Sequence, residues 1–358
     1  MAELVLGIGT SHTPLLVLPP EKWEGYGASD KENPELVWPP NGYTMSYEEA
    51  LTHVPKEIKR KYRGINEFRR QAAECQDALN TLAETLQGIA PDIVIIISDD
   101  QDEWFFENNM PCFSVYWGTT APLRPRQIGN RGDAEIREMI IAGYGSESRE
   151  ISVAHDFGRF LVERLTAAEF DVSQFTYVEE EHGGSVSRRY PTRNGELELV
   201  KTTPRRSQGL PHGYSFVISR LLRGCGATVL PVFQNTCYPP NTPSPRRCFN
   251  LGMAIADAIR SWPEASRVAV IGSGGLSHFV VDEELDGLVL DALHAKDPGA
   301  LAALPRNRLY SATSESLNWV TVGGAMQDSC LQMKLLAYVP VYRSEAGTGG
   351  GWAFAHWT

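Results

Sequence analysis

The alternation of short, β-rich apolar runs with amphipathic helical patterns is the feature that most constrains how this chain can fold. The clearest example is the all-apolar run Ile93–Ile97, which follows a long pattern of apolar residues spaced at alternating steps of four and three. The apolar residues of that helical pattern are Phe68, Ala72, Cys75, Leu79, Leu82, Leu86 and Ile89. An all-apolar strand is buried on both faces, and strands that alternate with helices are typical of α/β folds. We therefore predict an α/β protein with a central mixed sheet flanked by helices.

The rest of the chain continues this alternation, apart from two long segments. Further strands are expected at Leu4–Ile8, Thr228–Phe233 and Arg267–Ile271, and further helices at 154–168, 213–223, 248–261, 283–296 and 314–328. Residues 19–55 mix prolines, tryptophans and tyrosines with charges, which predicts a packed lid, because disordered segments are poor in aromatic residues. Residues 183–210 are mostly polar, so we expect them to form a flap. No linker separates these parts, so we expect residues 1–358 to form a single catalytic domain.

Composition excludes several classes of function. The chain has 33 basic and 44 acidic side chains, a net charge of 33 − 44 = −11, which argues against binding to nucleic acids or anionic membranes. No apolar run approaches the roughly 20 residues that span a bilayer. The start of the chain carries Glu3 and no basic region, unlike a signal peptide, and the six scattered cysteines are typical of reduced thiols. Together these features predict a cytoplasmic protein.

Polar residues of a suggestive kind follow three of the predicted strands. The first strand leads to His12, the second to Asp99 and Asp100, and the third to the glycine turn that ends at His278. Taken singly, each has a plain structural explanation: a hydrogen-bonded histidine, a helix cap or a packing turn. However, the carboxyl ends of parallel strands meet at one edge of a sheet. Imidazole and carboxylate at one edge indicate a metal site or an acid/base site.

Other motifs carry less information. The turn GSGG lacks the GxGxxG spacing of dinucleotide-binding folds, and the chain has no GxxxxGK[ST] phosphate loop. Ser273 and Ser277 do not lie in the GxSxG elbow of α/β-hydrolases. His182 and His212 are each followed by glycine, and each is either an active-site residue or a loop hydrogen-bonding residue; we favour an active-site role for His212.

Five segments in order along the chain resemble the class III extradiol ring-cleaving dioxygenases, the family of the protocatechuate 4,5-dioxygenase β subunit. They are GIGTSHTP at 7–14, PDIVIIISDDQDEWFFENNMPCFSVYWG at 91–118, PVFQNTCYPPNTPSPRRCFNLGMAIADAI at 231–259, RVAVIGSGGLSHFV at 267–280 and SATSESLNWVTVGGA at 311–325. The resemblance implies opening of a catecholic ring next to its paired hydroxyls, with non-haem Fe(II), or Mn(II) in its place, and O₂ as co-substrate.

The resemblance also implies roles for individual residues. His12 and Glu315 fall on metal-ligand positions, His278 on the catalytic acid/base and His212 on a further active-site histidine. Family members usually read Asn-Asp-His at the second metal-ligand motif, where this chain reads Ser98-Asp99-Asp100, which puts Asp100 at the ligand position.

The Asp-Asp-Gln run at 99–101 is similar to a branch of the family with that sequence at the second motif. Asp99, or His53 from the lid, are the alternative ligands to Asp100. Fe(II) accepts both imidazole and carboxylate, so the exchange is chemically permitted.

The expected substrate is a small aromatic diol or a hydroxylated heteroaromatic compound, covered by aromatic residues of the lid. No separate small subunit is evident, so we expect a homodimer or a higher homo-oligomer. A rival interpretation is a Zn(II)- or Mn(II)-dependent hydrolase, in which Asp100 and Glu315 bind the metal and His278 activates water. A third is a non-catalytic relative that has lost its iron.

Overall fold

One large mixed sheet forms the centre of the computed structural model, which describes residues 1–126, 133–179 and 181–358. Its nine described strands are β1 Glu3–Thr10, β4 Ile93–Asp99, β5 Phe113–Tyr116, β8 Ser173–Phe175, β13 Thr228–Gln234, β14 Arg267–Ser273, β15 His278–Val280, β16 Met333–Tyr342 and β17 Thr348–Trp357. The order is β15-β17-β1-β14-β4-β13-β5-β8, with β16 paired to β17. Strands β1, β14, β4 and β13 are parallel, whereas β17 and β5 run antiparallel to β1 and β13. The predicted fold class is confirmed.

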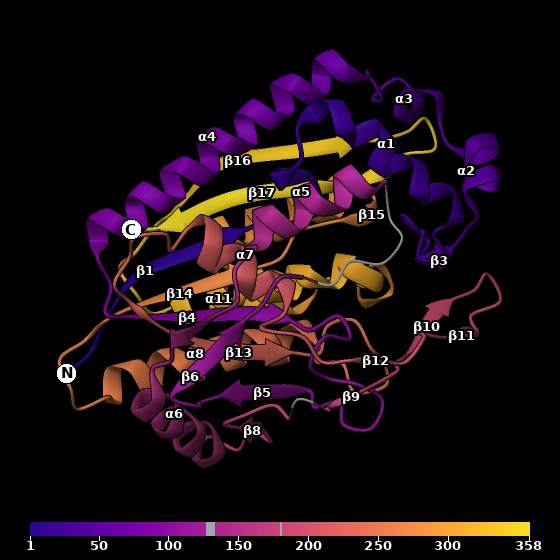
Figure 1. Ribbon diagram of the computed structural model, residues 1–358. Coiled ribbons are helices and arrows are strands. Elements are labelled where there is room, and N and C mark those ends of the chain that lie inside the picture. The colour runs from indigo at the N-terminus through magenta and orange to yellow at the C-terminus, as the bar shows by residue number, and fades with distance from the viewer. Residues whose placement is uncertain (127–132, 180) are drawn as a thin grey trace.

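Helices cover both faces of this sheet (Figure 1). They are α4 Ile65–Ile89, α5 Ala134–Tyr144, α6 His155–Ala167, α7 His212–Arg220, α8 Pro245–Ser261, α9 Glu283–His294, α10 Pro298–Ala302 and α11 Ser316–Met326. Helices α4, α5 and α7 lie on one face, and α11, packed against α8, lies on the other. All the helices predicted from the sequence are present.

The long helix and the strand after it illustrate how the pattern becomes structure. Every residue of β4 is buried, including the all-apolar run Ile93–Ile97 that predicted a central strand. Helix α4 buries the apolar side chains at spacings of three and four that predicted it, among them Leu79, Leu82 and Leu86. Between α8 and α11 the backbones approach closely, since a Cβ on Gly252 would meet the carbonyl oxygen of Thr321 at 1.9 Å.

The segment 19–55 is folded and packed. It contains α1 Trp23–Gly27, α2 Tyr47–His53 and the short strands β2 Val37–Trp38 and β3 Tyr43–Thr44, followed by α3 Lys56–Lys59. Trp23 is buried against Trp352 of β17, and Asp30 forms a buried bidentate ion pair with Arg343. Trp23, Tyr26 and Trp38 are buried, as expected for a packed segment. Its function as a lid stays a prediction.

The segment 183–210 contains two small antiparallel pairs, β9 Gly183–Gly184 with β12 Arg205–Arg206, and β10 Ser187–Pro191 with β11 Leu197–Lys201. The β10–β11 hairpin projects from the body of the molecule (Figure 1). A further pair, β6 Thr120–Leu123 and β7 Arg149–Ser152, lies outside the main sheet. None of the described helices has both the length and the apolarity needed to cross a bilayer.

The register of the parallel strands brings the predicted polar residues to one edge. Thr10 at the end of β1 pairs with Ser273 at the end of β14, and Asp99 at the end of β4 pairs with Gln234 of β13. Helices α7 and α11 begin at the same edge, where their first turns contact these strand ends. The candidate site lies there, as expected for a parallel sheet.

Candidate active site

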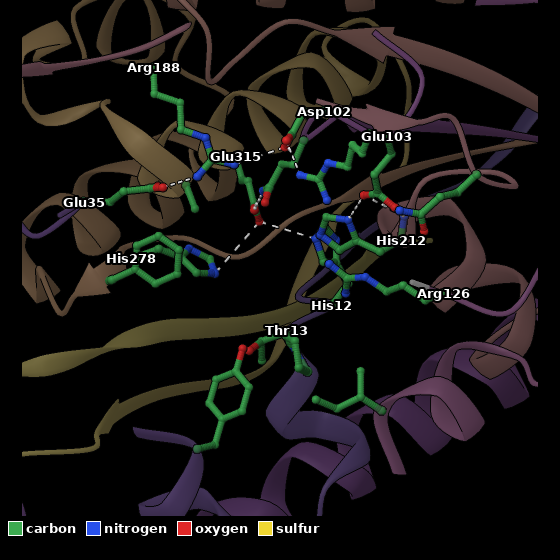
Figure 2. Close-up of a pocket in the computed structure, with 18 of the residues that line it drawn as sticks. His12, Thr13, Glu35, Asp102, Glu103, Arg126, Arg188, His212, His278 and Glu315 are labelled. Carbon is green, nitrogen blue, oxygen red and sulfur yellow. Dashed lines mark hydrogen bonds and ion pairs between the residues drawn. The ribbon is translucent and has the colours of Figure 1, made fainter. Parts of the chain in front are cut away.

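A cavity of about 230 Å³ opens at this edge of the sheet. It brings together four of the five residues that the sequence analysis singled out, namely His12, His212, His278 and Glu315, whose positions run from 12 to 315. Figure 2 shows the Glu315 carboxylate between the imidazoles of His12 and His278. Asp100, the fifth residue, is not among the residues that line the cavity.

The hydrogen bonds of His12 fix which of its nitrogens carries the hydrogen. The Ser273 hydroxyl donates to the carbonyl oxygen of Gly213 at 2.7 Å, so its oxygen accepts at 2.9 Å from His12 Nδ1. His12 Nε2 then carries a lone pair. This atom is buried and has no hydrogen-bond partner among the described residues. Burial and the neighbouring His212 and His278 imidazoles hold the pKa of His12 well below its usual value, which favours the neutral ring.

His278 has the same arrangement of ring nitrogens. Its Nδ1 lies 3.0 Å from the carbonyl oxygen of Leu276, an acceptor, so Nδ1 carries the hydrogen and Nε2 the lone pair. Its backbone N–H donates to the Thr313 hydroxyl oxygen at 2.9 Å. The ring lies against Gly275, where an added Cβ would meet His278 Cε1 at 2.0 Å. Glycine is therefore required at position 275 for the imidazole to occupy this place.

The two Nε2 lone pairs of His12 and His278 face the Glu315 carboxylate. Its Oε2 lies 3.7 Å from His12 Nε2 and 4.0 Å from His278 Nε2, and it accepts from the Gly275 N–H at 2.8 Å. Its Oε1 accepts from Gln101 Nε2 at 2.7 Å. Burial and the nearby Asp99 carboxylate raise the pKa of Glu315 well above its usual value. Two imidazole lone pairs and a buried carboxylate form an electron-rich centre, which a proton or a metal cation stabilises.

The donor types suit a divalent transition metal, which binds imidazole nitrogen and carboxylate oxygen. The unpartnered Nε2 of His12 facing Glu315 is the observation that supports this fit. Within the described ranges, however, no group of three or more His, Cys, Asp or Glu side chains is arranged to hold a metal ion. Two of the three expected ligands thus face each other, and the third is missing from the cavity.

That third residue, Asp100, instead accepts hydrogen bonds from backbone N–H groups. Its two carboxylate oxygens accept from the N–H groups of Glu103 and Trp104 at 3.0–3.1 Å and from that of Phe105 at 2.5 Å. These bonds hold the turn after β4, the capping function that was the structural alternative. Gln101, the next residue, lines the cavity and bonds both Glu315 and Asp99. Gln101 therefore lies in the cavity beside Glu315, where Asp100 was expected.

The two alternative ligands also lie elsewhere. Asp99 accepts from Asn318 at 3.0 Å and from Gln101 at 3.1 Å, and does not line the cavity. His53 is exposed on α2 and lines a different cavity, between the 38–61 segment and β15. His182 Nε2 lies 2.8 Å from the carbonyl oxygen of Trp104, so this histidine forms a hydrogen bond to the loop and does not line the cavity.

His212 forms an imidazole–carboxylate pair that the sequence analysis did not identify. Its Nδ1 and its backbone N–H both donate to Glu103, and its ring packs edge-on against that of His12 with centroids 4.8 Å apart. Burial by itself would raise the pKa of Glu103, but the positive fields of His212 and Arg126 and the bonds from His212 lower it to about 2. Glu103 is therefore ionised and fixes the orientation of the His212 ring. The only sequence signal for it was the acidic run at 99–103.

The wall opposite the histidines is built from ion pairs. Arg188 of β10 binds Glu35 and Asp102, and Arg205 of β12 binds the second oxygen of Asp102. Asp102 is fully buried and also accepts from the Tyr238 hydroxyl at 3.0 Å. These contacts attach the 183–210 segment to the turn after β4, as Figure 2 shows for Arg188.

Arg126 differs from the other three arginines that line the cavity, which all bind carboxylates. Its guanidinium lies over the ring of Tyr144, 5.1 Å from the centroid. Throughout the part of the chain that the structure describes, no carboxylate lies within ion-pair distance of it. Its charge acts on His12, Glu103 and Glu315, so it is close to the electron-rich centre. No sequence motif distinguished this residue.

Comparison with known proteins places this geometry in context. Residues 198–347 match the family model described as the catalytic LigB subunit of aromatic ring-opening dioxygenase. The chain is 28% identical over 149 residues to gallate dioxygenase from Pseudomonas putida, a match covering 38% of this chain and 43% of that protein. It is 25% identical over 206 residues to 2,3-dihydroxyphenylpropionate/2,3-dihydroxicinnamic acid 1,2-dioxygenase from Burkholderia vietnamiensis, covering 58% of this chain and 49% of that protein.

Both matches span less than half the length of the relative. The family match includes His212, His278 and Glu315, whereas His12 and Gln101 lie outside its range.

Proposed function

We infer that this chain, which belongs to the family of the catalytic LigB subunit of aromatic ring-opening dioxygenase, itself opens an aromatic diol or hydroxylated heteroaromatic ring with O₂. The observation that carries this proposal is the convergence of two imidazole lone pairs, on His12 and His278, upon the buried Glu315 carboxylate. We further propose that cleavage is extradiol and that both atoms of O₂ enter the product.

In this proposal His12 and Glu315 would hold a divalent metal, Fe(II) or Mn(II), through Nε2 and the carboxylate. When bound, such an ion supplies a Lewis-acid centre that lowers the pKa of a coordinated diol and a redox centre that reacts with O₂. Asp100 is assigned to its backbone bonds rather than to the metal, and Gln101 holds the Glu315 carboxylate from the side opposite Gly275.

His278 is the proposed general base. Its neutral ring presents the Nε2 lone pair to the cavity, at 4.0 Å from Glu315 Oε2, where a diol hydroxyl bound beside Glu315 can deliver its proton. The same nitrogen can return that proton later in the reaction. His212, held by Glu103, is placed beside His12 to hydrogen-bond a substrate oxygen.

The ring substituent that best matches the cavity is an anionic group. Arg126 supplies a cation without a carboxylate partner among the described residues, and arginine binds carboxylates in bidentate fashion. The two relatives are named for gallate and dihydroxyphenylpropionate, which both carry a carboxylate. We therefore propose a carboxylated aromatic diol as the substrate class, with its carboxylate on Arg126.

The experiment that tests the activity is O₂ consumption after anaerobic reconstitution. The full-length protein is loaded with Fe(II) or Mn(II), mixed with catechol, carboxylated catechols or hydroxylated pyridines, and followed with an oxygen electrode. Metal-dependent O₂ uptake with one of these rings is expected. No O₂ uptake with any ring, together with hydrolysis by the Zn(II)-loaded protein, would establish the hydrolase interpretation instead. Inactivity with all metals would indicate a non-catalytic relative.

A further inference from the structure

We propose that Asp286, a residue of α9 outside the cavity, is a positioning residue for His278 and acts through Ser277. The proposal rests on the proposed function, since it assigns His278 the function of base. It concerns a buried carboxylate that the proposed mechanism does not otherwise use.

Asp286 binds both donors of the residue before His278. The Ser277 N–H donates to Asp286 Oδ1 at 2.8 Å, and the Ser277 hydroxyl donates to Oδ2 at 2.7 Å. The Tyr338 hydroxyl of β16 donates to the same Oδ2 at 2.7 Å. One carboxylate thus fixes the backbone and the side chain of Ser277 together, and both residues are fully buried.

The neighbouring strand is shaped to admit this carboxylate. An added Cβ on Gly351 of β17 would lie 1.9 Å from Asp286 Oδ2 and 2.9 Å from Ser277 Oγ. A side chain at position 351 is therefore incompatible with Asp286 in this place. Gly351 also exchanges backbone bonds with the turn, donating to the Ser277 carbonyl oxygen at 2.9 Å and accepting from the Leu276 N–H at 3.0 Å.

These contacts determine where the His278 ring lies. The carbonyl oxygen of Leu276, which orients the ring through Nδ1, precedes Ser277 directly. If the peptide between Leu276 and Ser277 rotates, that carbonyl oxygen and the ring move together. Fixing the Ser277 N–H, which belongs to this same peptide, prevents the rotation. Asp286 therefore controls the direction of His278 Nε2 without touching the cavity.

The electrostatic surroundings of Asp286 are unusual for a buried carboxylate. No cation forms an ion pair with it in the described part of the chain, and the Asp282 carboxylate, which itself binds Arg308, acts on it with the same sign of charge. Tyr338 faces it from β16, with Glu283 and Tyr342 nearby. Burial raises the pKa of Asp286 to about 7, against the opposing effect of the Ser277 and Tyr338 bonds. A buried carboxylate without a counter-ion costs stability, which is consistent with a positioning function.

The test compares Asp286→Asn with Tyr338→Phe in the metal-loaded, full-length protein. The asparagine variant presents an NH₂ group to donors that need an acceptor, whereas the phenylalanine variant removes one donor and leaves Ser277 bound. For Asp286→Asn we expect kcat to fall about 10- to 100-fold with KM and metal content unchanged. Tyr338→Phe should retain kcat within about twofold. Ser277→Ala, a smaller change, should reproduce part of the loss.

A second measurement is independent of activity. The His278 ring signal in an NMR spectrum of ¹³C-histidine-labelled protein, assigned by its loss in His278→Gln, should shift in Asp286→Asn and stay in place in Tyr338→Phe. This result would support positioning even if the protein proved not to be a dioxygenase. An unmoved signal in Asp286→Asn, or equal effects of the two variants on signal and kcat, would overturn the proposal.

Discussion

The unpartnered Nε2 atom of His12 lies 3.7 Å from Oε2 of Glu315, and both side chains are almost fully shielded from solvent. His278 Nε2 lies 4.0 Å from the same oxygen. Lone pairs facing a buried carboxylate without an intervening hydrogen are unfavourable, since each group lacks the partner it had in water. A cation bound among them would remove this cost, which supports the proposed metal site.

Removing His12 should therefore abolish metal binding. For His12→Ala we expect the affinity for Fe(II) or Mn(II) to fall by more than about 100-fold, because the loss of a ligand exceeds that of an outer partner. Anaerobic titration calorimetry measures this directly. His278→Ala serves as the matched control, since it should retain stoichiometric metal but lose turnover. Full turnover in the His278 variant would eliminate it as the base.

Removing Asp100 should instead lower stability and leave metal affinity nearly unchanged. Asp100→Ala leaves the buried N–H groups of Glu103, Trp104 and Phe105 without their acceptor, so the free energy of unfolding should drop by at least about 2 kcal/mol. Metal affinity should remain within about threefold of the wild-type value. Urea denaturation and the same calorimetric titration separate the two effects. A loss of metal with unchanged stability would restore Asp100 as a ligand.

The pH dependence follows from His278. Burial lowers its pKa to about 4, against the opposing Nδ1–H bond to Leu276. A base works in its unprotonated form, so kcat should persist down to about pH 5 and fall as the pH drops through 4. The unfolded chain takes up this proton first, near pH 6.5, so stability should also decline as the pH falls from about 6.5 to 4. A kcat profile with its acid midpoint near 6.5 would disagree with this environment.

The ion pairs at Asp102 should hold the 183–210 segment closed. Asp102→Asn weakens the bonds to both Arg188 and Arg205, so limited proteolysis between residues 183 and 206 should become several-fold faster. KM should rise because the cavity wall is displaced. Glu107→Gln is a suitable control, since it removes an exposed pair with Lys201 in the same region. Equal rates of proteolysis in the Asp102→Asn and Glu107→Gln variants would refute the function assigned to Asp102.

Arg126 should set the preference for anionic rings. Arg126→Gln is expected to raise KM for carboxylated diols by about 10- to 100-fold, the value of one charge-assisted hydrogen bond, and to leave KM for catechol unchanged. Arg189→Gln, an arginine of β10 that does not line the cavity, is the matched control. An equal rise in KM for carboxylated diols and for catechol would show that Arg126 does not recognise the carboxylate.

Much of the sheet and most helices were predictable, because β4 and α4 bury side chains at the periods their sequences show. The hairpin of β16 and β17 was not predicted, although β17 lies beside β1 in the sheet. Its glycines weaken the strand pattern. One of them, Gly351, is needed where the Asp286 carboxylate approaches, a tertiary constraint that a local pattern does not contain.

In the candidate site, too, some residues were predictable from the sequence and others were not. His12, His278 and Glu315 follow predicted strands or begin a predicted helix, so the shared edge of the sheet was enough to bring them together. For Asp100 and Gln101, which are adjacent in the sequence, the outcome depends on the local turn. Asp100 faces the backbone N–H groups and Gln101 faces the cavity. The functions proposed for Arg126 and Glu103 depend on residues distant in the sequence, Glu315 for Arg126 and His212 for Glu103, so no local pattern predicts them.

The most direct test of the central claim is isotopic. A single turnover of the Fe(II)-loaded protein with a carboxylated catechol under ¹⁸O₂, followed by mass spectrometry of the product, reports the source of each new oxygen. We predict a ring-opened product that carries two ¹⁸O atoms, apart from exchange with water. A product whose new oxygen comes only from water, or an intact ring, would contradict the account.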